Sequence, residues 1–193
     1  MLDLKGKRLI LASQSPRRAA LLRLLRLEFE VMDSGVEEDK EQHTIPEVHV
    51  LELAERKAWK VAKRIDAGII VGADTVVELD GQILGKPNSD QEARDMLHRL
   101  SGKTHTVYTG FALVDQPTGK CFSEFEKTRV VFRCLEDEEI ETYIKTDSPL
   151  DKAGAYGIQD LSAVFAERID GCFYNVVGFP LTKFYLCLRA FCR

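Results

Sequence analysis

Three short segments of this 193-residue chain combine residue types that suit the binding and cleavage of phosphate groups. The densest is Asp151–Gln159 (DKAGAYGIQ), which places an acid, a base, two glycines, an aromatic ring and an amide in nine positions. Glycine lets a backbone approach a ligand closely, and a lysine such as Lys152 supplies a point charge suited to phosphate. We interpret the segment as a binding loop. A tight surface turn is the alternative, because glycine and aspartate also occur in ordinary loops.

The second segment, RLILASQSPRR, is an apolar run followed by a small polar turn and a pair of arginines. Ser15 suits a helix N-cap, and Pro16 suits the first helical position, where its missing N–H costs nothing. Arg17 and Arg18 then lie in the first turn, where the helix dipole is already positive. An anion would resolve this conflict, so we expect a phosphate cradle made of free N–H groups, the hydroxyls of Ser13 and Ser15 and the two guanidinium groups. Two solvated surface arginines are the alternative.

The third segment, Gly68–Thr75 (GIIVGADT), has no polar side chain until it reaches Asp74. Such a run predicts a strand buried on both faces, with Asp74 at its carboxyl end, where open α/β sheets bind their ligands. A carboxylate there can hold Mg²⁺ or take a proton from water. A turn aspartate or a helix cap is an equally good interpretation of this segment alone.

The remaining chain alternates between expected strands and helices, which indicates an α/β fold. One helix should run from Pro46 to about Ile65 and carry Lys57 on or beside its apolar face. The turns Asp80-Gly81 and Asp170-Gly171 indicate hairpins. The expected strands are Glu28–Met32, Val76–Leu79, Gln82–Leu84, His105–Asp115, Cys121–Arg133, Val164–Ile169 and Cys172–Val176. The other expected helices begin at Pro16, run from a capping box at Ser89 to near Gly102, and span Glu136–Lys145 and Pro180–Arg193.

The composition fits one soluble α/β domain spanning residues 1–193, a mixed fold with a central twisted sheet flanked by helices and room for two lobes around a cleft. Hydrophobic residues make up 45% and charged residues 30%, and the net charge of −4 argues against binding to nucleic acid polymers. No stretch is long enough for a membrane span. The five cysteines include no C-x-x-C pair, so we expect reduced thiols in a cytoplasmic protein.

Taken in order, the motifs SQSPRR, LAERKA, GADT, GKP, SGKTH, DKAGAYGIQ and NVVGFPL resemble the Maf family of nucleoside triphosphate pyrophosphatases along nearly the whole chain. The resemblance implies a Maf/ITPase-like fold, a small-molecule nucleotide substrate and a divalent metal such as Mg²⁺ or Mn²⁺. It also implies a homodimer. The implied reaction cleaves a nucleoside triphosphate between its α- and β-phosphates and releases a monophosphate and pyrophosphate.

The resemblance also implies roles for individual residues. Asp74 would be the proton acceptor, and Glu37 would join it around the metal, although Glu38 could exchange roles with Glu37. The implied phosphate-binding residues are Ser13, Arg18, Lys57, Lys86 and Lys152. Lys86 stands in LGKP, whereas many pyrimidine-type relatives carry an acid before this lysine.

Substrate choice rests on Arg17, Thr75 and Gln159, which are similar to the branch of the family that acts on dTTP and UTP. An amide such as Gln159 can both donate to and accept from the edge of a pyrimidine. Tyr156 could stack on the base or belong to the core. The alternatives are a 7-methyl-GTP pyrophosphatase of the same family and a nucleotide-binding regulator of cell division and septum formation.

Overall fold

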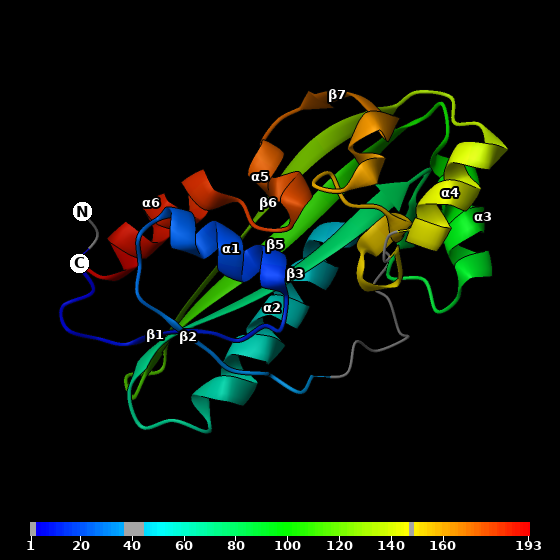
Figure 1. The fold of residues 1–193 in the computed structure, drawn as a ribbon. Coiled ribbons are helices and arrows are strands. Elements are labelled where there is room, and N and C mark those ends of the chain that lie inside the picture. The colour runs from blue at the N-terminus through cyan, green and yellow to red at the C-terminus, as the bar shows by residue number, and fades with distance from the viewer. Residues whose placement is uncertain (1–2, 37–44, 147–148) are drawn as a thin grey trace.

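A twisted seven-stranded sheet runs through the protein in the order β2-β1-β3-β5-β6-β7, with β4 paired to β3 outside that path (Figure 1). The computed structural model describes residues 3–36, 45–146 and 149–193. Strand β1 is parallel to β2 and β3, and the other pairs are antiparallel. The strands are β1 Leu9–Leu11, β2 Glu30–Val31, β3 Gly68–Leu79, β4 Gln82–Leu84, β5 Thr104–Gln116, β6 Lys120–Phe132 and β7 Ala166–Asp170. The structure thus confirms a mixed α/β domain.

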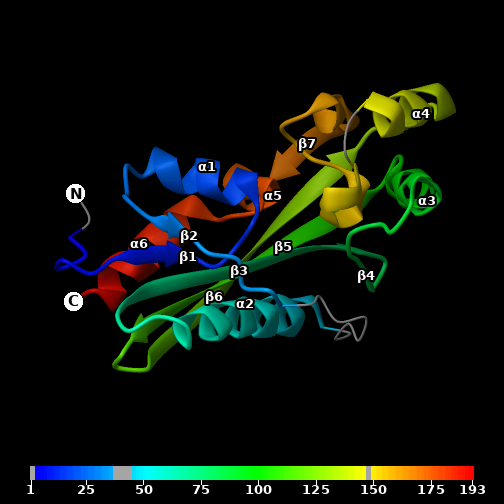
Figure 2. The same ribbon diagram turned by 60° about the horizontal axis from the view of Figure 1, so that its bottom comes forward.

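Helices cover both faces of this sheet. Figure 2 shows α2 alone beneath the sheet, α1, α5 and α6 above it, and α3 with α4 at one end. The helices are α1 Pro16–Leu24, α2 Pro46–Ala62, α3 Asp90–Leu100, α4 Asp137–Thr146, α5 Phe173–Val177 and α6 Leu181–Phe191, and short 3₁₀ turns are η1 Pro149–Asp151, η2 Ala153–Ala155 and η3 Leu161–Phe165. Among the described residues no helix has both the length and the apolar character to cross a membrane.

Helix α2 touches the backbone of the sheet at two glycines. A Cβ atom on Gly72 would lie 2.0 Å from the carbonyl oxygen of Ala54, and one on Gly110 would lie 2.5 Å from that of Val50. Gly72 lies two residues before Asp74 on β3, and Gly110 is the direct partner of Asp74 on β5, so both contacts are next to Asp74. Any larger side chain at these positions would lift the helix away from the sheet.

The opposite face of β3 is divided between two hydrophobic clusters. Ile69, Val71 and Ala73 pack with α1 and α6, whereas Val77 and Leu79 pack with α3 and α4. Alternate residues of a strand point to the same face, so the odd-numbered residues of β3 share this face. One of them lies between the two clusters. That position is Thr75, so the two expected lobes meet the strand on either side of it.

One edge of β3 lacks a neighbouring strand along its middle. Strand β1 pairs with residues 69–71 of β3, its ladder ends where Ala12 N donates to Val71 O at 2.8 Å, and β4 pairs only with residues 77–79. Within the described residues, positions 72–76 therefore have a strand partner on the β5 side alone. This interruption leaves space beside Asp74 and Thr75 at the carboxyl end of β1.

The structure corrects two predictions made from the sequence. Asp74 lies in the middle of β3, because the β-branched residues after it keep pairing with β5 as far as Glu78. The second predicted hairpin is wrong: β7 pairs with β6, and the segment Cys172–Val176 contributes to helix α5 instead. Gly178 ends that helix in the left-handed conformation. The apolar pattern of the segment favoured a strand and did not indicate this helix.

The other elements agree with the sequence within a few residues. The strand expected at Glu28–Met32 is shorter and is only Glu30–Val31, and the helix expected to reach about Ile65 ends at Ala62. The hairpin turn at Asp80-Gly81 is confirmed, and both residues have positive φ, as its turn type requires. All five cysteines are described and none is in a disulfide.

Candidate active site

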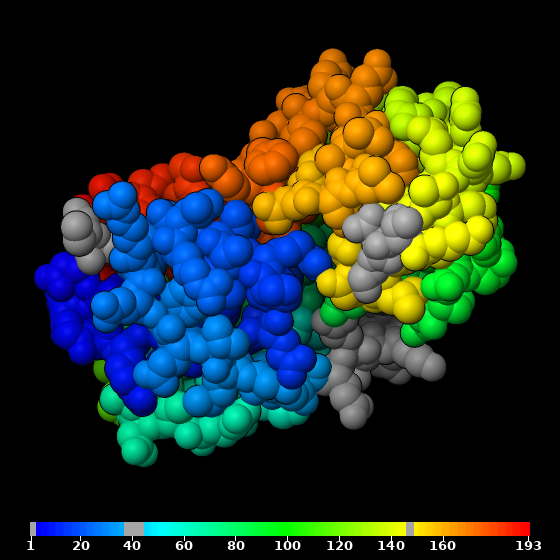
Figure 3. All heavy atoms as spheres, viewed as in Figure 1, coloured from blue at the N-terminus to red at the C-terminus, as the bar shows by residue number. Residues whose placement is uncertain are grey.

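The interruption beside β3 opens into a cavity of about 360 Å³. Its walls come from the SQSPRR turn, the middle of β3, the segment Asp151–Gln159 and the turn at residues 33–36. Figure 3 shows the hollow between the blue N-terminal segment and the orange and yellow C-terminal segments. All the expected site residues that the structure describes line this cavity: Ser13, Arg17, Arg18, Lys57, Asp74, Thr75, Lys86, Lys152 and Gln159.

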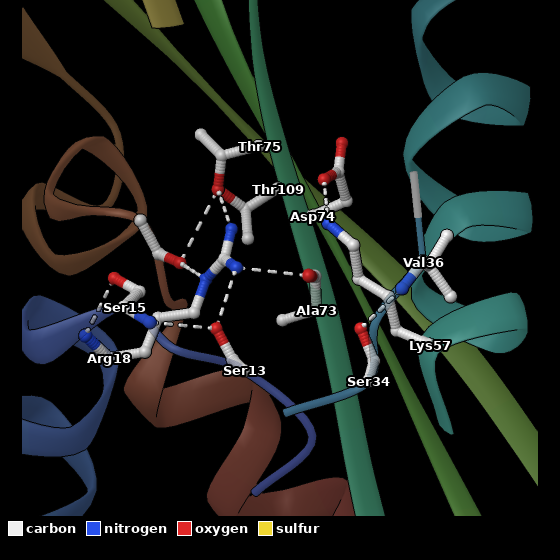
Figure 4. A network of polar contacts seen from close by, with 11 residues as sticks. Ser13, Ser15, Arg18, Ser34, Val36, Lys57, Ala73, Asp74, Thr75 and Thr109 are labelled. Atoms are coloured by element: carbon white, nitrogen blue, oxygen red, sulfur yellow. Dashed lines mark hydrogen bonds and ion pairs between the residues drawn. The ribbon is translucent and has the colours of Figure 1, made fainter. Parts of the chain in front are cut away.

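Arg18 occupies the place that a neighbouring strand would take (Figure 4). Its Nη1 donates to the carbonyl oxygen of Ala73 at 3.0 Å and to Ser13 Oγ at 3.3 Å. Its Nε donates to the carbonyl oxygen of Gly178 at 3.0 Å, and its Nη2 donates to Thr75 Oγ1 at 2.9 Å. The guanidinium group therefore joins α1, β3 and the end of α5, and much of its donor capacity is used within the protein.

The start of α1 agrees with the sequence. Ser15 is the N-cap, its Oγ accepts from the backbone N–H of Arg18 at 3.4 Å, and Pro16 takes the first helical position. The first turn contains no acidic residue. The positive end of the helix and two arginines therefore face the cavity together, which favours an anionic ligand.

Asp74 and Lys57 form a buried ion pair on the α2 face of the sheet (Figure 4). Lys57 Nζ donates to Asp74 Oδ1 at 2.6 Å, and the two side chains are 8% and 7% exposed. The glycine contact at Gly72 brings α2 close enough for this approach. Within the described part of the chain, Asp74 Oδ2 accepts no hydrogen bond, which leaves it available to a water or a cation in the cavity.

Arg17 and Lys152 share a carboxylate across the cavity. Arg17 Nη1 donates to Asp151 Oδ2 at 2.8 Å and its Nη2 to the Asp151 carbonyl oxygen at 3.1 Å, while Lys152 Nζ lies 3.1 Å from Asp151 Oδ1. Partial burial acts to raise the pKa of the Asp151 carboxyl, but the hydrogen bonds and charges of Arg17 and Lys152 outweigh it and hold that pKa below its usual value. The pair of cations thus links α1 to the glycine-containing loop.

Gly154 lets that loop pack closely against β3 and the end of β4. Gly154 has φ of +68°, and a Cβ atom there would lie 2.9 Å from Val77 Cγ2, while its N–H donates to the carbonyl oxygen of Gly85 at 2.9 Å. Only glycine fits this combination of left-handed backbone and close contact. The loop is therefore a built wall of the cavity, whereas Lys86 and Gln159 are exposed at its rim.

Tyr156 belongs to the core more than to the cavity. It is buried, its hydroxyl pairs with His105 Nε2 at 2.7 Å, and its ring packs edge-on against Phe132 with centroids 4.8 Å apart. Burial raises the pKa of the Tyr156 hydroxyl and lowers that of the His105 imidazole to about 4. The proton therefore lies on Tyr156, which donates to a neutral His105.

A divalent cation fits the donors that the cavity offers. Asp74 and Asp33 both line it, and carboxylate oxygens are the ligands that Mg²⁺ prefers. No cluster of three acidic, histidine or cysteine ligands occurs among the described residues. Magnesium sites commonly use one or two carboxylates and take their other oxygens from substrate phosphates and water, so this donor set suits them. Glu37, the second expected ligand, lies outside the described residues.

The sequence predictions missed one wall of the cavity, the turn at Asp33, Ser34 and Val36. This turn follows β2 at the carboxyl end of a parallel pair, where ligand-binding loops gather. Its acid-serine-glycine sequence was a usable signal, but the two-residue strand before it is too short to carry a clear apolar pattern.

Comparisons with known proteins find relatives along nearly the whole chain. A family model described as "Maf-like protein" matches residues 8–191. A dTTP/UTP pyrophosphatase of Caldicellulosiruptor bescii is 46% identical over 187 residues, covering 95% of this chain and 94% of that protein. One of Bacillus cytotoxicus is 48% identical over 185 residues, covering 96% of each. Among solved structures, a HAM1 protein from Coxiella burnetii overlaps with a TM-score of 0.47 at 18% identity, covering 65% of this chain and 73% of that chain.

Proposed function

The chain belongs to the Maf family, and from that premise we propose that it hydrolyses dTTP and UTP to the nucleoside monophosphate and pyrophosphate. The observation that carries this proposal is the Lys57–Asp74 pair at 2.6 Å in a cavity where several cations converge. A triphosphate carries about four negative charges near neutral pH, so its hydrolysis needs cations on the phosphates and a base beside the attacking water.

Asp74 acts as the general base in this proposal. Lys57 holds Oδ1, so the carboxylate is fixed while Oδ2 takes a proton from water. The oxygen of that water forms the new bond to phosphorus, and the bond that links the α- and β-phosphates breaks. Asp74 and Glu37 would hold the metal, Mg²⁺ or Mn²⁺, which neutralises charge on the phosphates when bound.

The phosphate-binding residues divide into two groups in this proposal. Ser13, Lys57, Lys86 and Lys152 contact phosphate oxygens, and Lys152 is already directed into the cavity wall by its ion pairs. Arg18 adds positive charge at the same end while its hydrogen bonds hold Ser13 and Thr75 in place. This arrangement supplies preorganised positive charge without the reorganisation that water would need.

Recognition of the base falls to Arg17, Thr75 and Gln159, in keeping with the relatives that are dTTP/UTP pyrophosphatases. Gln159 lies exposed at the rim, where an amide can meet the polar edge of thymine or uracil. We further propose that the enzyme works in the cytoplasm, which its five thiols without a disulfide support, and that it forms a homodimer.

Product analysis tests the activity. Purified protein is incubated with Mg²⁺ or Mn²⁺ and a panel of dTTP, UTP, GTP and 7-methyl-GTP, and the nucleotide and phosphate products are identified. We expect monophosphate and pyrophosphate from dTTP and UTP. A nucleoside diphosphate as first product would exclude cleavage between the α- and β-phosphates. Fast turnover of 7-methyl-GTP alone would indicate the other branch, and binding without turnover would indicate a regulator.

A further inference from the structure

Asp160 lies directly behind the cavity wall, where it joins three parts of the chain. Its Oδ1 accepts from the backbone N–H of Ser162 at 2.9 Å and from Ser162 Oγ at 2.6 Å. Its Oδ2 accepts from the hydroxyl of the buried Tyr143 in α4 at 3.3 Å. The carboxylate is therefore held by η3 and α4 together, and its side chain is only 17% exposed.

The fourth contact of Asp160 is with Lys152. Lys152 Nζ lies 3.3 Å from Asp160 Oδ2, and the lysine side chain is 10% exposed. The lysine stem reaches this carboxylate by crossing Gly157, where an added Cβ atom would lie 2.8 Å from both Lys152 Cε and Asp160 Oδ2. A glycine at this position leaves the path of the lysine open.

Among the described residues, the two carboxylates that pair with Lys152 differ in their surroundings. Asp151 is 49% exposed, lines the cavity and also pairs with Arg17. A polyphosphate entering the cavity competes with Asp151 for both of these cations, because it offers them several charged oxygens at once. Asp160 lies behind the wall and is fixed by neutral hydrogen bonds, so its contact with Lys152 can persist when the cavity is filled.

From these contacts we propose that Asp160 is the positioning residue for Lys152, a role that rests on the proposed function. Lysine has a flexible four-carbon stem, and a preorganised charge contributes more to catalysis than one that must be ordered during the reaction. Asp160 fixes the ammonium group at the wall, where it meets the charge that develops on the phosphates. The residue acts through Lys152 and does not touch the substrate.

The opposite role for Asp160 would be competition, in which its carboxylate withholds Lys152 from the phosphates. The direction in which one substitution changes turnover distinguishes the two roles. Asp160→Asn keeps the size of the side chain and an acceptor for Ser162 but removes the charge. Competition predicts faster turnover, whereas positioning predicts slower turnover even though the cavity has become more positive.

The test measures kcat and KM for dTTP with the full-length protein and Mg²⁺. We expect Asp160→Asn to lower kcat about tenfold without raising KM, because a displaced cation still attracts the nucleotide but no longer meets the transition state. In a Lys152→Met background the same substitution should have no further effect. Tyr143→Phe removes only the 3.3 Å hydrogen bond to Oδ2 and keeps both the charge of Asp160 and its contacts with Ser162, so it should lower kcat less than Asp160→Asn does.

Gly157→Ala provides a second route if Asp160→Asn does not fold. The new methyl group displaces the lysine stem, so kcat should fall by a similar factor. Unchanged or faster turnover, or an equal loss in the Lys152→Met background, would overturn the positioning role while the hydrolysis proposal stands. An inactive parent protein would overturn both.

Discussion

Arg18 supplies a hydrogen bond that the open edge of β3 would otherwise lack. The carbonyl oxygen of Ala73 lies on the open edge of β3, and a buried carbonyl needs a donor. The guanidinium group supplies this donor and three further hydrogen bonds, so an arginine at the positive end of a helix is stabilised there by neutral oxygens. The charge conflict visible in the sequence is thus partly resolved within the protein, before any ligand binds.

Asp74→Asn should lower dTTP turnover by at least about a hundredfold, because the amide keeps the size of the side chain but cannot take a proton from water. The variant should stay folded by circular dichroism. Its thermal midpoint should fall, since the buried Lys57 loses its counter-charge. Asp115→Asn, which removes the charge of a buried carboxylate that pairs with Lys7 away from the cavity, is the control and should retain most activity. Near-normal turnover by Asp74→Asn would rule out this base.

Gln159→Ala should act selectively. If the amide pairs with the edge of the pyrimidine, its loss lowers kcat/KM for dTTP and UTP by about one to two orders of magnitude and changes GTP far less. Lys152→Ala should instead lower kcat/KM for every nucleotide, because a cation on the phosphates serves them all. Measuring both variants against dTTP, UTP, GTP and 7-methyl-GTP separates the roles. An equal loss on all four for Gln159→Ala would make that residue structural or phosphate-linked.

Much of the site was predictable at this scale because its residues lie in compact motifs. Ser15, Pro16 and the two arginines follow from local helix chemistry, and a carboxylate after an apolar run indicates a ligand site. The role of Asp160 was not predictable. Its partners Lys152, Tyr143 and Ser162 come from separate elements that only the tertiary structure brings together.

At the scale of elements, the position of α2 decides the geometry of the site. The glycine contacts next to Asp74 set the height of the helix above the sheet, and Lys57 lies on the helix at that level. The distance between ammonium and carboxylate is therefore fixed by contact between two backbones. Side-chain packing alone would leave it more adaptable.

Gly72→Ala should displace α2 and destabilise the protein by about 3 kcal/mol, because its methyl group would lie 2.0 Å from the Ala54 carbonyl oxygen. Turnover should fall with the loss of the Lys57–Asp74 contact. Urea unfolding and dTTP hydrolysis measure the two effects. Gly81→Ala is the control, because nothing lies within 4 Å of its Cβ position and only its positive φ costs about 1 kcal/mol. Equal losses for the two variants would contradict this account.

Element types were predictable where a pattern was long, and failed where tertiary contacts decided. Residues 68–79 form one strand, although the apolar run before Asp74 predicted that the strand would end at Asp74. Hydrogen-bonded pairing with β5 continues along the strand as far as Glu78, and a short stretch of sequence does not show this pairing with a distant strand. Helix α5 is apolar and β-branched, yet Asn175 is drawn inward to donate to Val107 O and Thr128 Oγ1. Such long-range hydrogen bonds override local strand propensity.

For the whole molecule, His105 links stability to pH. It is buried and neutral, and burial lowers its pKa from 6.5 in the unfolded chain to about 4. Below pH 6.5 the unfolded chain binds a proton that the folded protein does not, so this contribution to stability is complete above pH 6.5 and is lost as the pH falls towards 4. Between pH 7 and 5 the loss amounts to about 2 kcal/mol.

Urea unfolding at pH 7 and pH 5 tests this linkage. His105→Gln should lower stability at pH 7, because it removes the imidazole ring that bonds to the Tyr156 hydroxyl and packs against Phe132, but its stability should depend less steeply on pH than that of the parent. The exposed His98 provides the control for replacing a histidine as such. If the parent and His105→Gln lose the same free energy of unfolding between the two pH values, His105 does not carry the linkage.

The contact of α2 with Gly72 and Gly110 also means that two parts of the site should unfold in different ways. Half of it, Lys57 and Asp74, lies on elements joined backbone to backbone, whose amide protons should exchange with solvent only when the whole fold opens. The other half rests on short turns between residues 149 and 165, which side chains hold in place and which can open alone. Moderate heating should therefore abolish activity while the circular dichroism spectrum stays native. The highest temperature at which the enzyme is active is then set by local opening of these turns and not by unfolding of the sheet.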